Sequence, residues 1–331
     1  MTDGKTNRPV IGITMGDAAG IGPEIVLKSL LDADIRATNR CVIIGDGRHL
    51  RELAERRQMG LTFTEFGKDE HDAIEIFDLA NLSSDFDIGE DHAATGKASA
   101  EYIEAAVNLW SEGRIDAVST APISKKAIAL GGYDYPGHTE LLAELTNTKK
   151  FAMSFFADKL RVVLLSTHIS LTNAIDRVTT EGLIDRITFT DKTIGELLGR
   201  KIKIAVAGLN PHASEGGLFG TEEAERIAPA IEHCRDLGIE VTGPYAPDTI
   251  FLRGYKGDFD AVIALYHDQA TIAVKSLSFG SGVNVTLGLP LIRTSVDHGT
   301  AYDIAGKWIA DESSMQAAIR LAGELASRKY S

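Results

Sequence analysis

The sequence alternates between short apolar runs and longer stretches whose apolar positions recur at helical spacing. Residues 10–14 and 41–45 form two such runs, and residues 204–207 and 260–266 repeat the pattern later in the chain. Runs of this length, bounded by glycine and polar residues, are typical of buried strands. Strands that alternate with helices form a largely parallel sheet, so the sequence predicts an α/β fold.

The length and composition fit a soluble protein of more than one domain. The chain has 331 residues, of which 44% are hydrophobic and 24% charged. A single hydrophobic core rarely serves that many residues, so two domains are expected. No apolar run approaches the roughly 20 residues that cross a bilayer, and the N-terminal residues lack the apolar core of a signal peptide. A cytoplasmic protein without a membrane partner is therefore expected.

The charge balance argues against nucleic acid as a partner. There are 34 Lys and Arg residues against 47 Asp and Glu residues, a formal net charge of −13. Such a charge repels nucleic acid and anionic membranes. Only Cys41 and Cys234 are present, which excludes a disulfide framework and a CxxC metal motif. An anionic substrate would need locally placed cations or a metal ion.

Three histidines follow apolar runs at the point where each run ends. They are His168, His212 and His267. If the three strands are neighbours, their carboxyl ends meet and the imidazoles converge. Three nitrogen ligands with an open fourth position describe a catalytic divalent-metal site, most often zinc, with Mg, Mn or Co as other occupants. The alternative is three unrelated histidines, because no local HExxH motif supports the metal site.

The stretch 208–220 surrounds His212 with glycine. With Gly216, Gly217 and Gly220 nearby, His212 lies in a glycine-rich loop at a strand end and is a candidate ligand or acid/base group. The alternative is a tight loop with a solvated histidine. A second glycine-rich turn, residues 15–24, joins the first strand to a helix start and could hold a phosphate on backbone N–H groups. It is not the dinucleotide fingerprint G-x-G-x-x-G, and a purely structural turn explains it equally well.

Several polar groups downstream could bind an anion. Lys275, Asn284 and Arg293 together offer a clamp for a phosphate or carboxylate, with Arg293 as a bidentate donor. Arg293 lies in an apolar run, where an unpaired charge would be costly, and this favours a ligand. His138 and Thr139 begin a helix, where Thr139 could also act only as a cap.

These motifs resemble the 4-hydroxythreonine-4-phosphate dehydrogenase family over nearly the whole chain. The segments that carry the resemblance are Met-Gly-Asp at 15–17 with Gly-Ile-Gly-Pro-Glu at 20–24, Pro-Gly-His-Thr-Glu at 136–140, Gly-Leu-Asn-Pro-His at 208–212, Tyr-His-Asp-Gln at 266–269 and Arg-Thr-Ser-Val-Asp-His-Gly-Thr at 293–300. Three positions depart from the family pattern. Ala18 replaces a usual proline, and Ser214 and Ala270 replace small glycines.

The resemblance implies a fold and a cofactor. Relatives of the family are the isocitrate and isopropylmalate dehydrogenases, which implies two α/β/α domains: residues 1–123 with 284–331, and residues 124–283 with the metal ligands and the dimer interface. Their cofactor loop reads His-Gly-Ser-Ala-x-Asp-Ile-Ala-Gly, which residues 298–306 resemble. By analogy the adenosine half of NAD lies there. The cofactor-binding residues would be His298, Gly299, Thr300 and Asp303.

The resemblance also implies roles for the other candidates. His168, His212 and His267 become the ligands of one divalent metal per subunit. The substrate-binding groups would be His138, Thr139, Lys275, Asn284 and Arg293. A homodimer is implied, with the active site at the subunit interface and one ligand histidine from the partner.

The implied reaction is NAD-dependent oxidation of a phosphorylated hydroxy acid followed by decarboxylation. Local similarity at residues 133–136, 158–160, 166–169 and 247–249 favours the catabolic branch, which converts D-threonate 4-phosphate to dihydroxyacetone phosphate. Alternatives are 4-phosphohydroxy-L-threonine and a cis-dihydrodiol carboxylate. Two alternatives belong to other functional classes: a zinc aldolase or lyase, and a sugar-phosphate-binding regulator. Asp248, Asp268 and Lys126 are candidate proton carriers.

Overall fold

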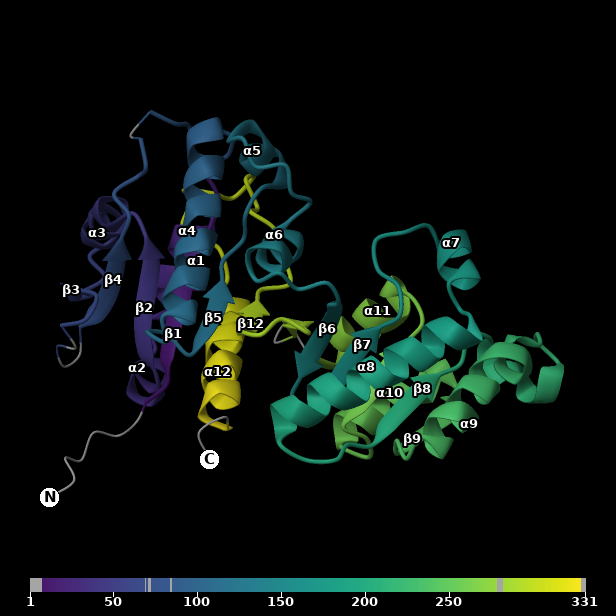
Figure 1. Cartoon of the computed structure of the whole chain (residues 1–331). Helices are drawn as coiled ribbons and strands as arrows, with labels where there is room; N and C mark the ends of the chain where they lie inside the picture. The colour runs from purple at the N-terminus through teal and green to yellow at the C-terminus, as the bar shows by residue number, and fades with distance from the viewer. Residues whose placement is uncertain (1–7, 69, 71–72, 84, 279–281, 329–331) are drawn as a thin grey trace, which may run out of the picture. The chain divides into compact units, whose positions relative to one another are not determined.

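A computed structural model describes residues 8–68, 70, 73–83, 85–278 and 282–328. The chain divides into two compact units, residues 1–151 with 289–331, and residues 152–288. Both units combine strands and helices, and most strand pairs are parallel. The predicted α/β fold with a largely parallel sheet is therefore confirmed (Figure 1).

The first unit is built on strands in the order β3-β4-β2-β1-β5-β12, and every pair in it is parallel. Its strands are β1 (Val10–Thr14), β2 (Arg40–Gly45), β3 (Phe63–Glu65), β4 (Ile74–Asp78), β5 (Ala117–Thr120) and β12 (Ile292–Ser295). Its helices are α1 (Gly22–Ser29), α2 (Ala33–Thr38), α3 (Gly47–Arg56), α4 (Ala93–Ser111), α5 (Lys125–Leu130), α6 (His138–Leu145) and α12 (Ser313–Arg328). Helices α4 and α12 pack on the central strands.

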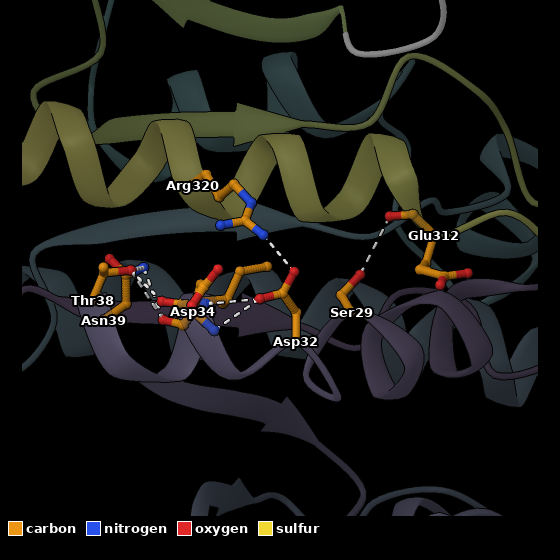
Figure 2. Close-up of polar contacts among 8 residues, drawn as sticks. Ser29, Asp32, Asp34, Thr38, Asn39, Glu312 and Arg320 are labelled. Carbon is orange, nitrogen blue, oxygen red and sulfur yellow. Dashed lines mark hydrogen bonds and ion pairs between the residues drawn. The ribbon is translucent and has the colours of Figure 1, made fainter.

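The C-terminal helix α12 completes the first unit. In Figure 1 this yellow helix lies among the purple and blue N-terminal elements. Arg320 of α12 forms an ion pair with Asp32, whose carboxylate also caps α2, and the hydroxyl of Ser29 donates to the carbonyl of Glu312 at 3.4 Å (Figure 2). Gly323 of α12 lacks a side chain where Asn39 packs against the helix. The two ends of the described chain thus share one core.

The second unit has strands in the order β11-β6-β7-β10-β8-β9. Its strands are β6 (Ala152–Ala157), β7 (Leu160–Leu164), β8 (Ile204–Ala207), β9 (Val241–Tyr245), β10 (Ala261–Ala264) and β11 (Val283–Leu287). Its helices are α7 (Leu171–Asp176), α8 (Thr180–Leu198), η1 (Pro211–Gly217), η2 (Glu223–Ile227), α9 (Ala228–Asp236), α10 (Pro247–Lys256) and α11 (His267–Ser278). The pairs β7–β10, β10–β8 and β8–β9 are parallel. The pairs β6–β7 and β11–β6 are antiparallel, and β6–β7 forms a hairpin.

The boundary between the units differs from the one expected from the sequence, which placed residues 124–283 in the second domain. Residues 124–151 belong to the first unit because Ile128, Leu141 and Leu142 pack against Ile103 and other apolar side chains of α4. Residues 284–288 belong to the second unit because β11 pairs with β6 along its whole length. Within the described residues, no helix combines the length and apolarity that a bilayer span needs.

Candidate active site

In the first unit, the order of the strands points to one candidate ligand position at their carboxyl ends. In the sheet, β1 lies between β2 and β5. The strands that follow β1 in the chain are added on the β2 side, and β5 is then added on the opposite side of β1. The order of the strands therefore reverses between β1 and β5. Ligands in open α/β sheets bind at such a reversal. The turns after β1, β5 and β12 therefore surround the place where a ligand is expected in this unit.

Arg293 is a buried cation close to this edge. It lies in β12 beside Val118 of β5 and is 3% exposed. Its Nε and Nη2 donate to the hydroxyl of Thr120 at 3.2 and 2.8 Å. Burial lowers the pKa of Arg293 to about 10, although the nearby Glu140 carboxylate opposes this shift. The guanidinium is thus still charged at neutral pH.

His138 lies close enough to Arg293 for the charge of the guanidinium to act on its imidazole. It is the first residue of α6, and within the described part of the chain its buried Nε2 atom has no hydrogen-bond partner. Burial of the ring, together with the positive charge of Arg293, holds the pKa of His138 well below its usual range. A neutral imidazole with a buried open nitrogen beside a buried cation can accommodate one anionic group. Thr139 follows on α6 and is partly exposed.

The other two predicted substrate-binding residues belong to the second unit. Asn284 lies in β11, and its side-chain oxygen is buried without a hydrogen-bond partner among the described residues. Lys275 lies in α11 and is exposed. A buried polar oxygen without a partner is uncommon in folded proteins, so Asn284 is suited to bind a ligand.

Two of the three predicted metal ligands lie together. His168 follows β7 and His267 begins α11 directly after β10, and these two strands are parallel neighbours. The centres of the two imidazole rings are 5.6 Å apart. Nδ1 of His267 lies 2.7 Å from a carboxylate oxygen of Asp268. The predicted convergence of strand-end histidines is therefore confirmed for this pair.

His212 does not join the pair within one chain. It follows β8, the neighbour of β10, but it lies in η1 with a φ of 53° and is exposed. Residues 212–216 all have positive φ values, so this loop leaves the strand along a left-handed path. In the part of the chain that the structure describes, no group of three His, Cys, Asp or Glu side chains could hold a metal ion.

The segment that resembles a cofactor loop packs against the glycine-rich turn after β1. The N–H of Ile21 donates to the carbonyl of Thr300 at 3.0 Å. A Cβ atom on Gly20 would lie 2.9 Å from both the Cβ and the carbonyl oxygen of Thr300. Gly20 is thus needed for close packing inside the protein. Of the two readings left open for this turn, the structure favours a scaffold for residues 298–306.

The remaining cofactor candidates are accessible from outside. Gly299 and Asp303 are exposed, and His298 is partly exposed, with its Nδ1 3.0 Å from the carbonyl oxygen of Gly299. In the second unit, Gly216 and Gly217 have open space around their Cα atoms.

The candidate proton carriers are surface groups. Asp248 lies in the first turn of α10 and is exposed. Asp268 is 73% exposed and is held by His267. Lys126 forms an ion pair with Asp91 at 3.2 Å, in the first unit.

A buried polar cluster of the first unit was not found from the sequence. Asp17 is fully buried and accepts a hydrogen bond from the hydroxyl of Tyr302 at 2.7 Å. Asp91 lies nearby and accepts a hydrogen bond from Ser124, which keeps its pKa below the ordinary value. One signal was available, since Asp17 stands alone among Gly, Ala and Met residues where an acid would be buried.

Comparisons with known proteins agree with the motif resemblance. A family model described as pyridoxal phosphate biosynthetic protein PdxA matches residues 37–322. The D-threonate 4-phosphate dehydrogenase of Cupriavidus necator is 47% identical, over 97% of this chain and 98% of the relative. The 4-hydroxythreonine-4-phosphate dehydrogenase of Desulforapulum autotrophicum is 46% identical, over 97% of this chain and 96% of the relative.

A solved structure extends the likeness to the fold. The crystal structure of a 4-hydroxythreonine-4-phosphate dehydrogenase from Burkholderia phymatum is 44% identical and matches with a TM-score of 0.85, over 96% of this chain and 98% of that one. The resemblance inferred from the motifs is thus confirmed. The chain belongs to the PdxA family and is a dehydrogenase that acts on a CH–OH group with a nicotinamide cofactor.

Proposed function

We propose that the protein oxidises D-threonate 4-phosphate with NAD and releases CO2, so that dihydroxyacetone phosphate is the product. The observation that carries this proposal is the buried guanidinium of Arg293 together with the buried Nε2 atom of His138. A chain of net charge −13 keeps a guanidinium 3% exposed, and its charge acts on an imidazole whose buried nitrogen has no partner in the part of the chain that the structure describes. Burial of the guanidinium costs desolvation free energy, and an anionic group that binds there compensates this cost.

The substrate-binding set follows from these two residues. Arg293 supplies the charge, and His138 and Thr139 supply neutral polar groups from the start of α6. Lys275 and Asn284 of the second unit complete the set in the proposal. The buried side-chain oxygen of Asn284, which has no hydrogen-bond partner among the described residues, supports this role.

The metal is proposed to bind His168 and His267, with His212 contributed by a second subunit. The chemistry of the first two residues fits a divalent ion, because their rings are neighbours and a carboxylate holds Nδ1 of His267. Zinc is proposed first, and Mg, Mn and Co are the alternatives. A bound divalent ion lowers the pKa of a substrate hydroxyl and stabilises negative charge that develops on a neighbouring oxygen.

A homodimer with the active site at the subunit interface follows from this metal site. Large apolar side chains are exposed beside two of the histidines: Ile169 follows His168, and Leu218 and Phe219 follow His212. Exposed apolar groups of this size are common where subunits meet. We place the enzyme in the cytoplasm, with no membrane or nucleic-acid partner.

The cofactor is proposed to lie on residues 298–306, with His298, Gly299, Thr300 and Asp303 in contact with it. Bound there, NAD would supply the hydride acceptor for the carbon that bears the hydroxyl, and a base would take the hydroxyl proton. The product is a β-keto acid, in which the bond to the carboxylate breaks and its electrons form an enolate. Protonation of that carbon completes the reaction. Asp248 and Asp268 are the proposed proton carriers, since both are exposed next to the histidine-bearing strands of the second unit.

A second substrate is supported by one comparison. The relative from Desulforapulum autotrophicum, 46% identical, is named 4-hydroxythreonine-4-phosphate dehydrogenase. The corresponding reaction here would convert 4-phosphohydroxy-L-threonine to 3-amino-2-oxopropyl phosphate. The two acids differ by a hydroxyl and an amine at one carbon, so both fit the same phosphate site.

The test is NADH absorbance with purified full-length protein, NAD and one divalent metal at a time. D-threonate 4-phosphate, 4-phosphohydroxy-L-threonine and a cis-dihydrodiol carboxylate are assayed in parallel. We expect NADH only with metal present, and the highest kcat/KM with D-threonate 4-phosphate. Cleavage of a phosphorylated acid without NAD would instead indicate an aldolase. No NADH with any of the three would refute a dehydrogenase of this substrate class.

A further inference from the structure

Tyr302 reaches from the proposed cofactor segment into the interior of the first unit. Its hydroxyl donates to the Oδ2 atom of Asp17 at 2.7 Å, and Asp17 is 0% exposed. The Oδ1 atom of Asp17 accepts the N–H of Ala19 at 2.9 Å, and Thr95 of α4 also bonds to this carboxyl group. Tyr302 occupies the position that the cofactor-loop pattern leaves open. The pattern therefore does not account for this contact.

Two glycines let neighbouring backbone come close to the same segment. The carbonyl of Thr300 accepts the N–H of Ile21, and a Cβ atom on Gly20 would collide with Thr300. On the other side, a Cβ atom on Gly89 would lie 2.9 Å from the carbonyl oxygen of Tyr302. Residues 300–302 are thus enclosed between two turns that belong to the same unit.

The backbone between these contacts is in an unfavourable conformation. Ala301 has a φ of 44°, in the left-handed region that residues with a Cβ rarely adopt. Such a conformation persists only where surrounding contacts hold it. The hydroxyl of Tyr302 is the next side-chain contact along the chain, so it is well placed to hold this turn.

Because Asp17 is buried, the hydrogen bond from the Tyr302 hydroxyl is important for stabilising its carboxylate. Burial raises the pKa of Asp17, while the hydrogen bonds from Tyr302, Ala19 and Thr95 oppose that shift. Without the tyrosine hydroxyl, a buried carboxylate would lose one of these donors. An unsatisfied buried acceptor is costly, so the segment would rearrange to relieve it.

We propose that Tyr302 and Asp17 are positioning residues that hold residues 298–306 in the shape that receives the adenosine part of NAD. Neither side chain needs to touch the cofactor in this role. The inference rests on the proposed function only in its assignment of NAD to this segment. The hydrogen bond and the backbone contacts belong to the protein without any cofactor.

The test compares Tyr302→Phe with Tyr133→Phe in the full-length protein. Both changes remove a tyrosine hydroxyl that bonds to a carboxylate in the first unit, since Tyr133 bonds to Glu104. Amide hydrogen exchange over residues 298–306 is measured without cofactor, and the Kd of NADH is measured by fluorescence titration. We expect Tyr302→Phe to accelerate exchange in this segment and to raise the Kd roughly tenfold. Tyr133→Phe should change neither.

Kinetics and a conservative variant separate positioning from general stability. Tyr302→Phe should raise the KM for NAD while kcat at saturating NAD stays within about twofold. Asp17→Asn keeps an acceptor for Tyr302 but removes the charge, so its Kd should lie between those of wild type and Tyr302→Phe.

The outcomes distinguish this inference from the proposed function. Wild-type binding of NADH with an unchanged Kd in Tyr302→Phe overturns the inference alone, whether or not exchange accelerates. A wild-type protein that binds no NADH overturns the cofactor assignment for the segment, and the proposed function with it. In that case the exchange data still report whether Tyr302 holds the segment.

Discussion

In the first unit, Arg293 and the Nε2 atom of His138 lie in the interior, with Thr120 and the start of α6 setting their positions. In the second unit, His168 and His212 are exposed, His267 is partly exposed, and only two of the three lie together. The first unit therefore prepares its anion site with its own contacts. The second unit presents metal ligands that need a further component, which we propose is a metal ion and a second subunit.

Replacement of Arg293 by Met tests the first half of this comparison most strongly. Removal of a buried charged hydrogen-bonding partner typically costs about 2 to 5 kcal/mol in binding, so kcat/KM should fall by roughly thirtyfold or more. The folding stability should stay equal or rise, because the native state no longer buries a guanidinium whose pKa burial lowers to about 10. Steady-state kinetics and a thermal melt check the two parts.

The melting temperature, read together with activity, shows whether Arg293 serves binding or folding. A variant that keeps activity would show that the anion site lies elsewhere. A variant that loses activity because its melting temperature collapses would show that Arg293 is structural. The expected combination, lost activity with retained stability, identifies a group kept for binding at a cost to the fold.

A smaller effect is expected in the pH dependence of stability. The pKa of His138 lies well below 6.5 in the folded protein, so between these two values the unfolded chain binds a proton that the folded chain does not. Stability therefore falls as the pH drops below about 6.5, by about 1.4 kcal/mol per pH unit for one such group. His138→Gln should make this acid limb shallower in urea unfolding between about pH 6.5 and 5.5.

Two other residues, His49 and Arg293, also affect how stability depends on pH in this range. Burial also lowers the pKa of His49 in the first unit, so His138→Gln should reduce the slope without abolishing it. Arg293→Met should narrow this limb from its acid end, because loss of the Arg293 charge raises the folded-state pKa of His138 while burial still holds it below 6.5. Equal slopes in wild type and His138→Gln would show that the imidazole is not held neutral by the fold.

Local patterns were sufficient for the strands and for part of the site. The apolar runs located β1, β8 and β10, and the rule that parallel strands end at one edge brought His168 and His267 together correctly. The path of the loop after β8 could not be read in the same way. Ala213 and Ser214 carry no conformational signature of the positive φ values that they adopt.

The unit boundary and the buried acid were missed for a different reason. Periodicity shows that Leu141 and Leu142 lie on an apolar face, but not that α4 is the helix they meet. The hydrogen bond of Asp17 joins residues 285 positions apart, and only the folded chain shows that pairing. Contacts between distant segments are therefore what the structure adds.

The metal site shared between subunits is tested most directly by complementation between two inactive variants. His168→Ala and His212→Ala are each expected to be inactive, and they are then co-expressed. If each site takes His168 and His267 from one subunit and His212 from the other, mixed dimers contain one intact site. A random mixture then recovers about a quarter of wild-type activity with metal and NAD. No recovery, in mixtures shown by mass spectrometry to contain the mixed dimer, would contradict the shared site.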